Sequence, residues 1–214
     1  MTVTKEQFNE ALKARHGQAR FEAFSKACVA ICGLGGLGSN IAINLTRAGI
    51  GKLILIDFDE VDVANLNRQQ YKISQVGMYK TEAMEINLKE ISPAVDIEIH
   101  TCRITEDNIA DLLGEADIIC EAFDKADQKA MLVDGVLTAL PGKPLVTGNG
   151  MASFRSPNLI KTRRVMKNFY MCGDGVNDVA DGEGLAAPRV NICASHQALT
   201  VLRILTGEIN DEEI

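Results

Sequence analysis

Residues 28–57 read CVAICGLGGLGSNIAINLTRAGIGKLILID, and this stretch decides the fold. An apolar strand opens into a glycine loop, a helix follows, and a second apolar strand ends at Asp57. Gly33 allows a tight turn, Gly35 lets backbone N–H groups approach a phosphate, and Gly38 lets the helix pack closely. The N-terminus of that helix attracts anions. This order predicts a nucleotide-binding unit.

Two further features distinguish this unit from a ligand-free turn with the same glycines. Asp57 follows Gly38 at the spacing and strand end where a carboxylate accepts hydrogen bonds from ribose hydroxyls. Asn65, Arg68 and Gln69 then form a cationic, amide-rich segment, which a triphosphate needs and a hydride-transferring dehydrogenase does not. An NAD-dependent oxidoreductase nevertheless remains an alternative at this point.

The rest of the chain alternates strands and helices. Strands are expected near 28–32, 52–57, 95–101, 116–121, 144–148 and 158–164, and helices near 37–48, 79–91, 105–113, 124–140 and 188–206. Thr4 and Gln7 form a capping box that opens an N-terminal arm within residues 1–25. The pattern predicts one α/β domain over 1–214, Rossmann-like, with a mostly parallel sheet and helices on both faces.

Composition restricts the class of partner. The chain has 214 residues, 46% of them apolar, a net charge of −7 and a pI near 5.0. This acidity argues against nucleic acid or an anionic membrane as the main partner. The polar first ten residues do not form a signal sequence, and no apolar run approaches the ~20 residues that span a bilayer. We therefore expect a cytoplasmic protein.

Five segments carry a resemblance to a known family: GLGGLGSN (33–40), AGIGKLILIDFDEVDVANLNRQ (48–69), VGMYK (76–80), EAFDKADQK (121–129) and PLVTGNG (144–150). They resemble the ThiF/MoeB family of ubiquitin-activating-enzyme-like adenylyltransferases, and most of all the short ThiF proteins of thiamine biosynthesis. The resemblance implies ATP- and Mg²⁺-dependent activation of the C-terminal glycine carboxylate of a small ubiquitin-like sulfur carrier protein, ThiS-like and ending in Gly-Gly.

The resemblance also assigns site residues. Adenylation requires charge compensation along the triphosphate and a carboxylate held in line with the α-phosphorus. By resemblance, Arg68 and Lys80 contact the ATP phosphates and Asp124 holds Mg²⁺, although Asp124 is also a candidate helix cap. The expected nucleotide-binding set is Gly33, Gly35, Gly36, Gly38, Asn40, Asp57, Asp59, Asn65, Arg68, Gln69 and Lys80. In it, Asp59 serves ribose or metal, and Asn65 binds phosphate or orders the Arg68 segment. Asn40 does the same or only stabilises the start of its helix.

Relatives in this family place an N-terminal arginine on the phosphates of the other subunit of a homodimer. Arg15 and Arg20 are the candidates here. We prefer Arg15, because it ends the predicted arm helix immediately before His16-Gly17. The resemblance therefore implies a homodimer in which Arg15 acts in trans.

Residues 168–187 read NFYMCGDGVNDVADGEGLAA and contain four glycines and four carboxylates. Their apolar residues have no regular spacing, which predicts an unpacked crossover loop that acts as a flap. Calcium binding by Asp174, Asp178, Asp181 and Glu183 is an alternative, but their spacing does not match an EF-hand.

The six cysteines form no CxxC pair, and in the segment that matches the first zinc-binding pair of many relatives only Cys172 remains. We therefore expect no structural zinc. Some relatives have a carrier-linking cysteine near the position of Ala180. Cys172 lies nearby, in the predicted loop, but it has no adjacent cation that would lower its pKa, and we expect no thiol nucleophile. His100 and His196 have no carboxylate or nucleophile at a recognisable spacing.

Four alternatives stay open. Within the family, the alternative substrates are a molybdopterin-synthase carrier, as for MoeB, and a tRNA-linked carboxylate. Outside it, an NAD-dependent oxidoreductase fits Asp57 and the glycine loop but not Arg68, Lys80 and Asp124. A non-catalytic scaffold has no need of these three charged residues.

Overall fold

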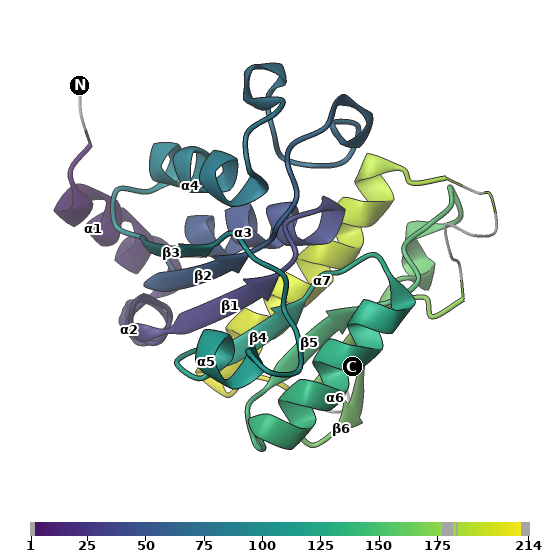
Figure 1. Cartoon of the computed structure of the whole chain (residues 1–214). Coiled ribbons are helices and arrows are strands. Elements are labelled where there is room, and N and C mark those ends of the chain that lie inside the picture. The colour runs from purple at the N-terminus through teal and green to yellow at the C-terminus, as the bar shows by residue number, and fades with distance from the viewer. Residues whose placement is uncertain (1–2, 177–181, 183, 211–214) are drawn as a thin grey trace.

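The computed structural model describes residues 3–176, 182 and 184–210. Its strands form one seven-stranded sheet in the order β3-β2-β1-β4-β5-β7-β6 (Figure 1). Neighbouring strands are parallel except for β6 and β7, which are antiparallel. The strands are β1 (Cys28–Cys32), β2 (Lys52–Ile56), β3 (Asp96–His100), β4 (Ile118–Glu121), β5 (Leu145–Gly148), β6 (Lys161–Met166) and β7 (Phe169–Gly173).

Helices cover both faces of this sheet. They are α1 (Lys5–His16), α2 (Gln18–Lys26), α3 (Gly36–Ala48), α4 (Lys80–Ile91), α5 (Ile109–Leu113), α6 (Ala126–Ala139) and α7 (Ala187–Thr206). In Figure 1, α5 and α6 lie in front of the sheet, and α3 and α7 lie behind it. The buried side chains of α3, α4 and α7 belong to one apolar cluster, and those of α5 and α6 to another. The expected α/β architecture is confirmed.

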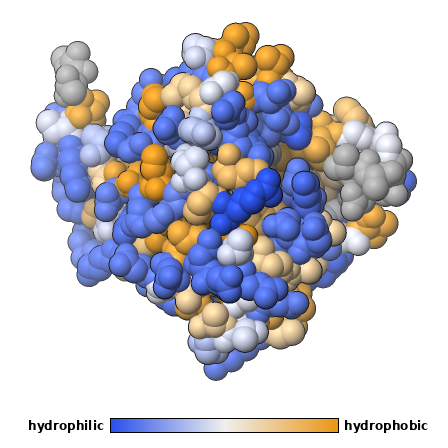
Figure 2. Space-filling model, viewed as in Figure 1, coloured by the Kyte–Doolittle hydropathy of each residue, from blue (hydrophilic) through white to orange (hydrophobic). Residues whose placement is uncertain are grey.

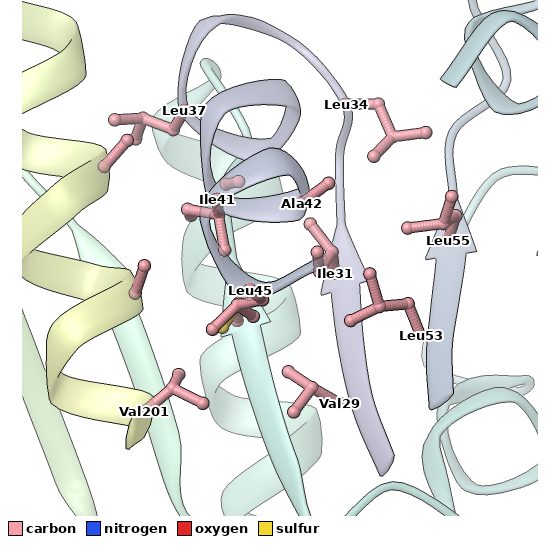
Figure 3. Close-up of a cluster of buried hydrophobic side chains, with 14 of the residues drawn as sticks. Val29, Ile31, Leu34, Leu37, Ile41, Ala42, Leu45, Leu53, Leu55 and Val201 are labelled. Atoms are coloured by element: carbon pink, nitrogen blue, oxygen red, sulfur yellow. The ribbon is translucent and has the colours of Figure 1, made fainter. Parts of the chain in front are cut away.

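The inner strand β1 shows why the sheet needs both helical layers. Val29 and Ile31 are fully buried against α3 and α7, where Ile41 and Val201 meet them (Figure 3). The alternate residue Ala30 is equally buried in the opposite cluster. A parallel strand buried on both faces reads as an uninterrupted apolar run, which is the pattern of residues 28–32.

The turn from β1 into α3 depends on two glycines. Gly33 has φ +94°, a left-handed conformation that favours glycine. A Cβ on Gly38 would lie 1.8 Å from the carbonyl oxygen of Gly33, so only glycine lets the first turn of α3 approach the strand this closely. These are the packing roles predicted for both positions.

The prediction for residues 168–187 was wrong at its start. Phe169–Gly173 form β7, which pairs with β5 on one side and β6 on the other. Tyr170 and Cys172 are buried on the α7 side of the sheet, and Phe169 is buried on the other. A short strand that is buried on both faces shows no alternation of apolar and polar residues. Its sequence therefore could not be told apart from the irregular, glycine-rich segment that follows it. Positions 177–181 and 183, which include Asp178, Ala180, Asp181 and Glu183, lie outside the described residues.

The N-terminal arm lies at the opposite end of the sheet from the glycine loop. The predicted capping box is present, with Gln7 N–H 3.2 Å from Thr4 Oγ1. Leu12 of α1 packs against Gly49, which precedes β2. The helix α2 lies almost entirely within the helical arm expected over residues 1–25, but the sequence did not predict the break at Gly17, where φ is +81°.

Other differences from the sequence prediction are small. The helix expected at 105–113 begins at Ile109, and the strand expected at 158–164 begins at Lys161, after a 3₁₀ turn at Pro157–Leu159. Among the described residues, no helix is both long and apolar enough to cross a membrane. On the face that Figure 2 shows, hydrophilic side chains predominate, with apolar ones between them.

Candidate nucleotide site

A cavity of about 490 Å³ opens where the C-terminal ends of the central strands meet the N-terminus of α3. This is where a doubly wound sheet binds its ligands. Ten residues proposed from the sequence line it: Gly33, Gly35, Gly36, Asp57, Asp59, Asn65, Arg68, Gln69, Lys80 and Asp124. Gly38, Asn40 and Arg15 do not. The fold thus gathers residues from five separate segments around one space.

Asp57 lies immediately after β2 and is almost completely buried. Its Oδ2 accepts a hydrogen bond of 2.6 Å from the Leu34 N–H, and its Oδ1 accepts one of 2.8 Å from the Asp59 N–H. Burial raises the pKa of Asp57 above its ordinary value, while the nearby Lys80 opposes that shift. The carboxylate therefore fixes the glycine loop as well as lining the cavity.

Lys80 begins α4, and its ammonium group lies in the cavity wall. The side chain is 6% exposed, and its Nζ lies 2.9 Å from Oδ2 of Asp59. The Lys80 N–H also donates to the Asp59 carbonyl oxygen at 2.9 Å. Asp59 therefore positions Lys80, which adds a role to the ribose or metal contacts expected for it.

The segment that carries Arg68 is held by amide side chains. Asn65 Oδ1 accepts from Nη2 of Arg68 at 3.2 Å, and Asn67 Oδ1 accepts from Nη1 at 2.9 Å. Asn40 reaches this segment from α3, because its Nδ2 donates to the Arg68 carbonyl oxygen at 3.2 Å. Asn40 thus orders the Arg68 segment from behind the cavity. Gln69 is also buried, and its Oε1 has no hydrogen-bond partner among the described atoms.

Asp124 is exposed at the cavity edge, after β4. The residue at the N-cap of α6 is Lys125, and no side-chain cap is present there, so Asp124 does not serve the capping role considered from the sequence. Below this loop, Glu121 is 1% exposed and its carboxylate pairs with Lys129 at 2.9 Å. The Phe123 N–H also donates to Glu121, at 2.7 Å. Sequence analysis did not identify Glu121.

A second feature missed from the sequence is the stacked pair of Phe58 and Arg103. The guanidinium carbon of Arg103 lies 3.7 Å from the centroid of the Phe58 ring, and both residues line the cavity. A cation over an aromatic face is a stabilising contact. The available signal was the aromatic residue directly after Asp57; nothing in the sequence linked it to Arg103.

Comparisons with known proteins identify the family of this chain. The sequence profile of the ThiF family matches residues 8–214. This chain belongs to the ThiF family. Ubiquitin-like modifier-activating enzyme 5 of Caenorhabditis elegans is 47% identical over 85 residues, which are 40% of this chain and 20% of that protein. Adenylyltransferase and sulfurtransferase MOCS3 of Dictyostelium discoideum is 29% identical over 192 residues, which are 84% of this chain and 43% of that protein.

Solved structures share the fold of this ThiF-family chain. E. coli tRNA N6-threonylcarbamoyladenosine dehydratase, TcdA, solved in complex with ATP, has a TM-score of 0.85 at 22% identity, covering 97% of this chain and 98% of that one. E. coli MccB with ATP has a TM-score of 0.68 at 21% identity, covering 92% and 60%. The chain spans less than half the length of the two curated relatives described above.

The residues of this cavity fit magnesium only together with a bound nucleotide. Within the described residues, no group of three or more His, Cys, Asp or Glu side chains is arranged to hold a metal ion. Mg²⁺ usually takes one or two carboxylates plus phosphate oxygens and waters. Asp124, exposed at the cavity edge and engaged by no other described residue, suits that mode.

The arm arginines lie away from this cavity. Arg20 pairs with Glu208 at 2.8 Å. Arg15 is exposed at the end of α1, near the N-terminal end of the sheet. The structure therefore does not bring Arg15 to the cavity of its own chain, and its action in trans remains a proposal.

The surroundings of Cys172 and of two histidines differ from those expected from the sequence. Cys172 is fully buried in β7, and burial raises the pKa of its thiol to about 11, so it is not an exposed loop thiol. His100 Nε2 lies 2.7 Å from Glu98, its neighbour two residues earlier on the same face of β3. His196 contacts Thr162 at 3.0 Å, and burial lowers its pKa. The calcium candidate Asp174 is buried against Arg189.

Proposed function

We propose that this chain adenylates a carboxylate with ATP, and that the substrate is the C-terminal glycine of a small ubiquitin-like carrier protein. One observation carries the proposal: Asp57, Arg68, Lys80 and Asp124 converge on a single cavity at the N-terminus of α3. A ribose-binding carboxylate, two phosphate-directed cations and a metal-compatible carboxylate are the groups that adenylation requires. The names of the similar curated proteins support this activity and this class of partner.

The protein contributes position and charge. Asp57 binds ribose, while Arg68, Lys80 and the N–H groups of the glycine loop neutralise the phosphates. Asp124 would hold Mg²⁺, which when bound balances phosphate charge and favours departure of pyrophosphate. The carrier's carboxylate oxygen bonds to the α-phosphorus as the bond to the pyrophosphate oxygen breaks, giving acyl-adenylate and pyrophosphate. No protein nucleophile is required, in agreement with the burial of Cys172.

The specific substrate we propose is a ThiS-like sulfur carrier of thiamine thiazole synthesis. Two alternatives use the same chemistry. The first is a molybdopterin-synthase carrier, and the relative MOCS3, named an adenylyltransferase and sulfurtransferase, is compatible with a sulfur carrier. The second is a tRNA-linked carboxylate, which the printed name of TcdA suggests. The net charge of −7 makes the tRNA substrate the weaker of the two.

Pyrophosphate–ATP exchange tests the function. Labelled pyrophosphate should enter ATP only with Mg²⁺ and a matching Gly-Gly-ended carrier. The ThiS-like carrier, the molybdopterin-synthase carrier and tRNA are assayed side by side. Arg68→Ala and Asp124→Ala should each reduce exchange by about a hundredfold or more, because each removes a transition-state charge contact. Arg47→Ala, an exposed substitution in α3, is the control. Tight NADH binding without exchange for any substrate would refute the proposal.

A further inference from the structure

A buried ion pair joins the two ends of the segment between β7 and α7. Asp174 directly follows β7, and Arg189 is the third residue of α7. Their side chains are 5% and 4% exposed, and Nη2 of Arg189 donates to Oδ2 of Asp174. Neither residue lines the cavity. The pair therefore acts on the site through other residues.

Arg189 also binds the segment that follows β5. Its Nε donates to the Ala152 carbonyl oxygen at 3.0 Å, and its Nη1 donates to those of Arg155 at 2.9 Å and Ser156 at 2.7 Å. A planar guanidinium with five N–H donors is suited to such a set of acceptors, whereas an ammonium group is not. One side chain thus joins the end of β7, the start of α7 and the segment after β5.

That segment is held in an unfavourable backbone conformation. Ser153 is fully buried and has φ +87°, the only positive φ outside glycine among the described residues. Its N–H donates to the Gly184 carbonyl oxygen at 2.9 Å. Such a conformation persists only where surrounding contacts enforce it. The three carbonyls bound by Arg189 flank Ser153 on both sides and supply that enforcement.

The segments joined by Arg189 form one wall of the cavity. Its lining residues are Asn149, Gly150, Met151, Ala152, Gly175, Val176 and Leu185. This wall contains no charged side chain, in contrast to the side that carries Asp57, Arg68 and Lys80. Phosphates are usually bound with the help of cations, which this wall lacks, whereas its apolar side chains and backbone groups suit an extended peptide. The wall is therefore the place for the carboxyl substrate.

On the basis of the proposed function, we propose that the Asp174–Arg189 pair is a positioning element for the acyl substrate. It fixes the wall along which the carrier's C-terminal peptide extends toward the α-phosphate, and it leaves the nucleotide contacts to the opposite side. Its loss should weaken use of the carrier far more than binding of ATP.

Three variants test this assignment. Arg189→Met removes the guanidinium, Arg189→Lys keeps the charge without the planar donor set, and Asp174→Asn/Arg189→Met avoids leaving one buried charge unpaired. Arg47→Met is the matched control, because Arg47 is exposed on α3 and away from the cavity lining. The readouts are the Kd of an ATP analogue, the KM for the carrier in pyrophosphate exchange, and amide hydrogen exchange.

We expect the KM for the carrier to rise about tenfold or more in Arg189→Met and in the double variant, with the Kd for the ATP analogue changed less than about twofold. The KM of Arg189→Lys for the carrier should lie between the values for these variants and for the wild type. Hydrogen exchange should increase in residues 149–156 and remain unchanged in β1 and α3.

Different failures have different meanings. If the wild type shows no pyrophosphate exchange with any carrier, the proposed function fails. Amide hydrogen exchange and nucleotide binding still report on the wall. If the wild type is active and Arg189→Met leaves both KM and the exchange of residues 149–156 unchanged, the positioning role is wrong. If affinity for the ATP analogue falls as much as use of the carrier, or if increased amide hydrogen exchange spreads through β1, the pair has a general stabilising role and the proposal is overturned.

Discussion

The ammonium group of Lys129 lies 2.9 Å and 3.0 Å from the two carboxylate oxygens of Glu121, under the loop that leads to Asp124. The same ammonium donates to the Gly148 carbonyl oxygen at 2.8 Å. Glu121 ends β4, and Gly148 ends β5. The pair therefore joins two strand ends directly below the cavity.

Lys129→Met should lower the free energy of unfolding by about 3–5 kcal/mol near neutral pH, because it leaves a buried carboxylate without its counterion. The loss should depend on pH. Burial already raises the pKa of Glu121 above its ordinary value, and Lys129 opposes that rise. A raised folded-state pKa means that the stability associated with this group is present at low pH and is lost as pH rises through that pKa.

Removing Lys129 raises the pKa of Glu121 further, so the deficit in stability should be larger near pH 8 than near pH 5. Urea denaturation at the two pH values measures it. Lys125→Met, at an exposed position in the same loop, is the control and should change stability by less than about 0.5 kcal/mol. Equal deficits at both pH values would contradict the charge-based explanation.

Two glycine substitutions should separate stability from nucleotide binding. Gly38→Ala places a methyl group 1.8 Å from the Gly33 carbonyl oxygen and should destabilise the protein by about 1–3 kcal/mol or more. Gly35→Ala meets only Gln69 Nε2, at 3.8 Å, but its methyl group enters the cavity lining. We expect near-normal stability and weaker ATP binding for Gly35→Ala. Thermal denaturation and calorimetric titration of both variants provide the check.

The cysteines should differ in their response to ATP. Cys102 is half-buried and lines the cavity, so bound ATP should slow its alkylation by iodoacetamide. Cys28 is equally half-buried but begins β1 at the other end of the sheet, and ATP should leave its alkylation unchanged. Cys172 should react only after unfolding, since it is buried and its thiol pKa is about 11. Peptide mapping measures the alkylation of all three cysteines. Rapid labelling of Cys172 in the native protein would show that this thiol is accessible and would contradict its burial.

Arg15 gives a test of the proposed homodimer. Arg15→Ala and Asp124→Ala dimers should each be nearly inactive. Random subunit exchange makes about half the dimers mixed, and each mixed dimer has one site that combines the intact Arg15 of one chain with the intact Asp124 of the other. About a quarter of wild-type activity should therefore return on mixing. Arg47→Ala, at an exposed position in α3 outside the cavity lining, is the control. Absence of recovery after proven exchange would exclude action of Arg15 in trans.

The sequence alone determined the first half of the candidate nucleotide site. From β1 to Asp57, the backbone conformation depends on residues that are close in sequence. The glycine dihedrals, the start of α3 and the end of β2 all lie within about 30 residues. The positions of Gly33, Gly38 and Asp57 could thus be read from spacing. The apolar runs of the parallel strands likewise followed from burial on both faces.

Only the tertiary structure decided which distant groups meet. The pairing of Glu121 with Lys129, of Asp174 with Arg189, and of Phe58 with Arg103 joins residues that no local pattern connects. The strand β7 and the burial of Cys172 were also missed, because the pairing of this short segment with β5 and β6 depends on residues distant in the sequence. Local backbone preferences fix the turns, whereas desolvation and charge pairing are properties of the assembled fold.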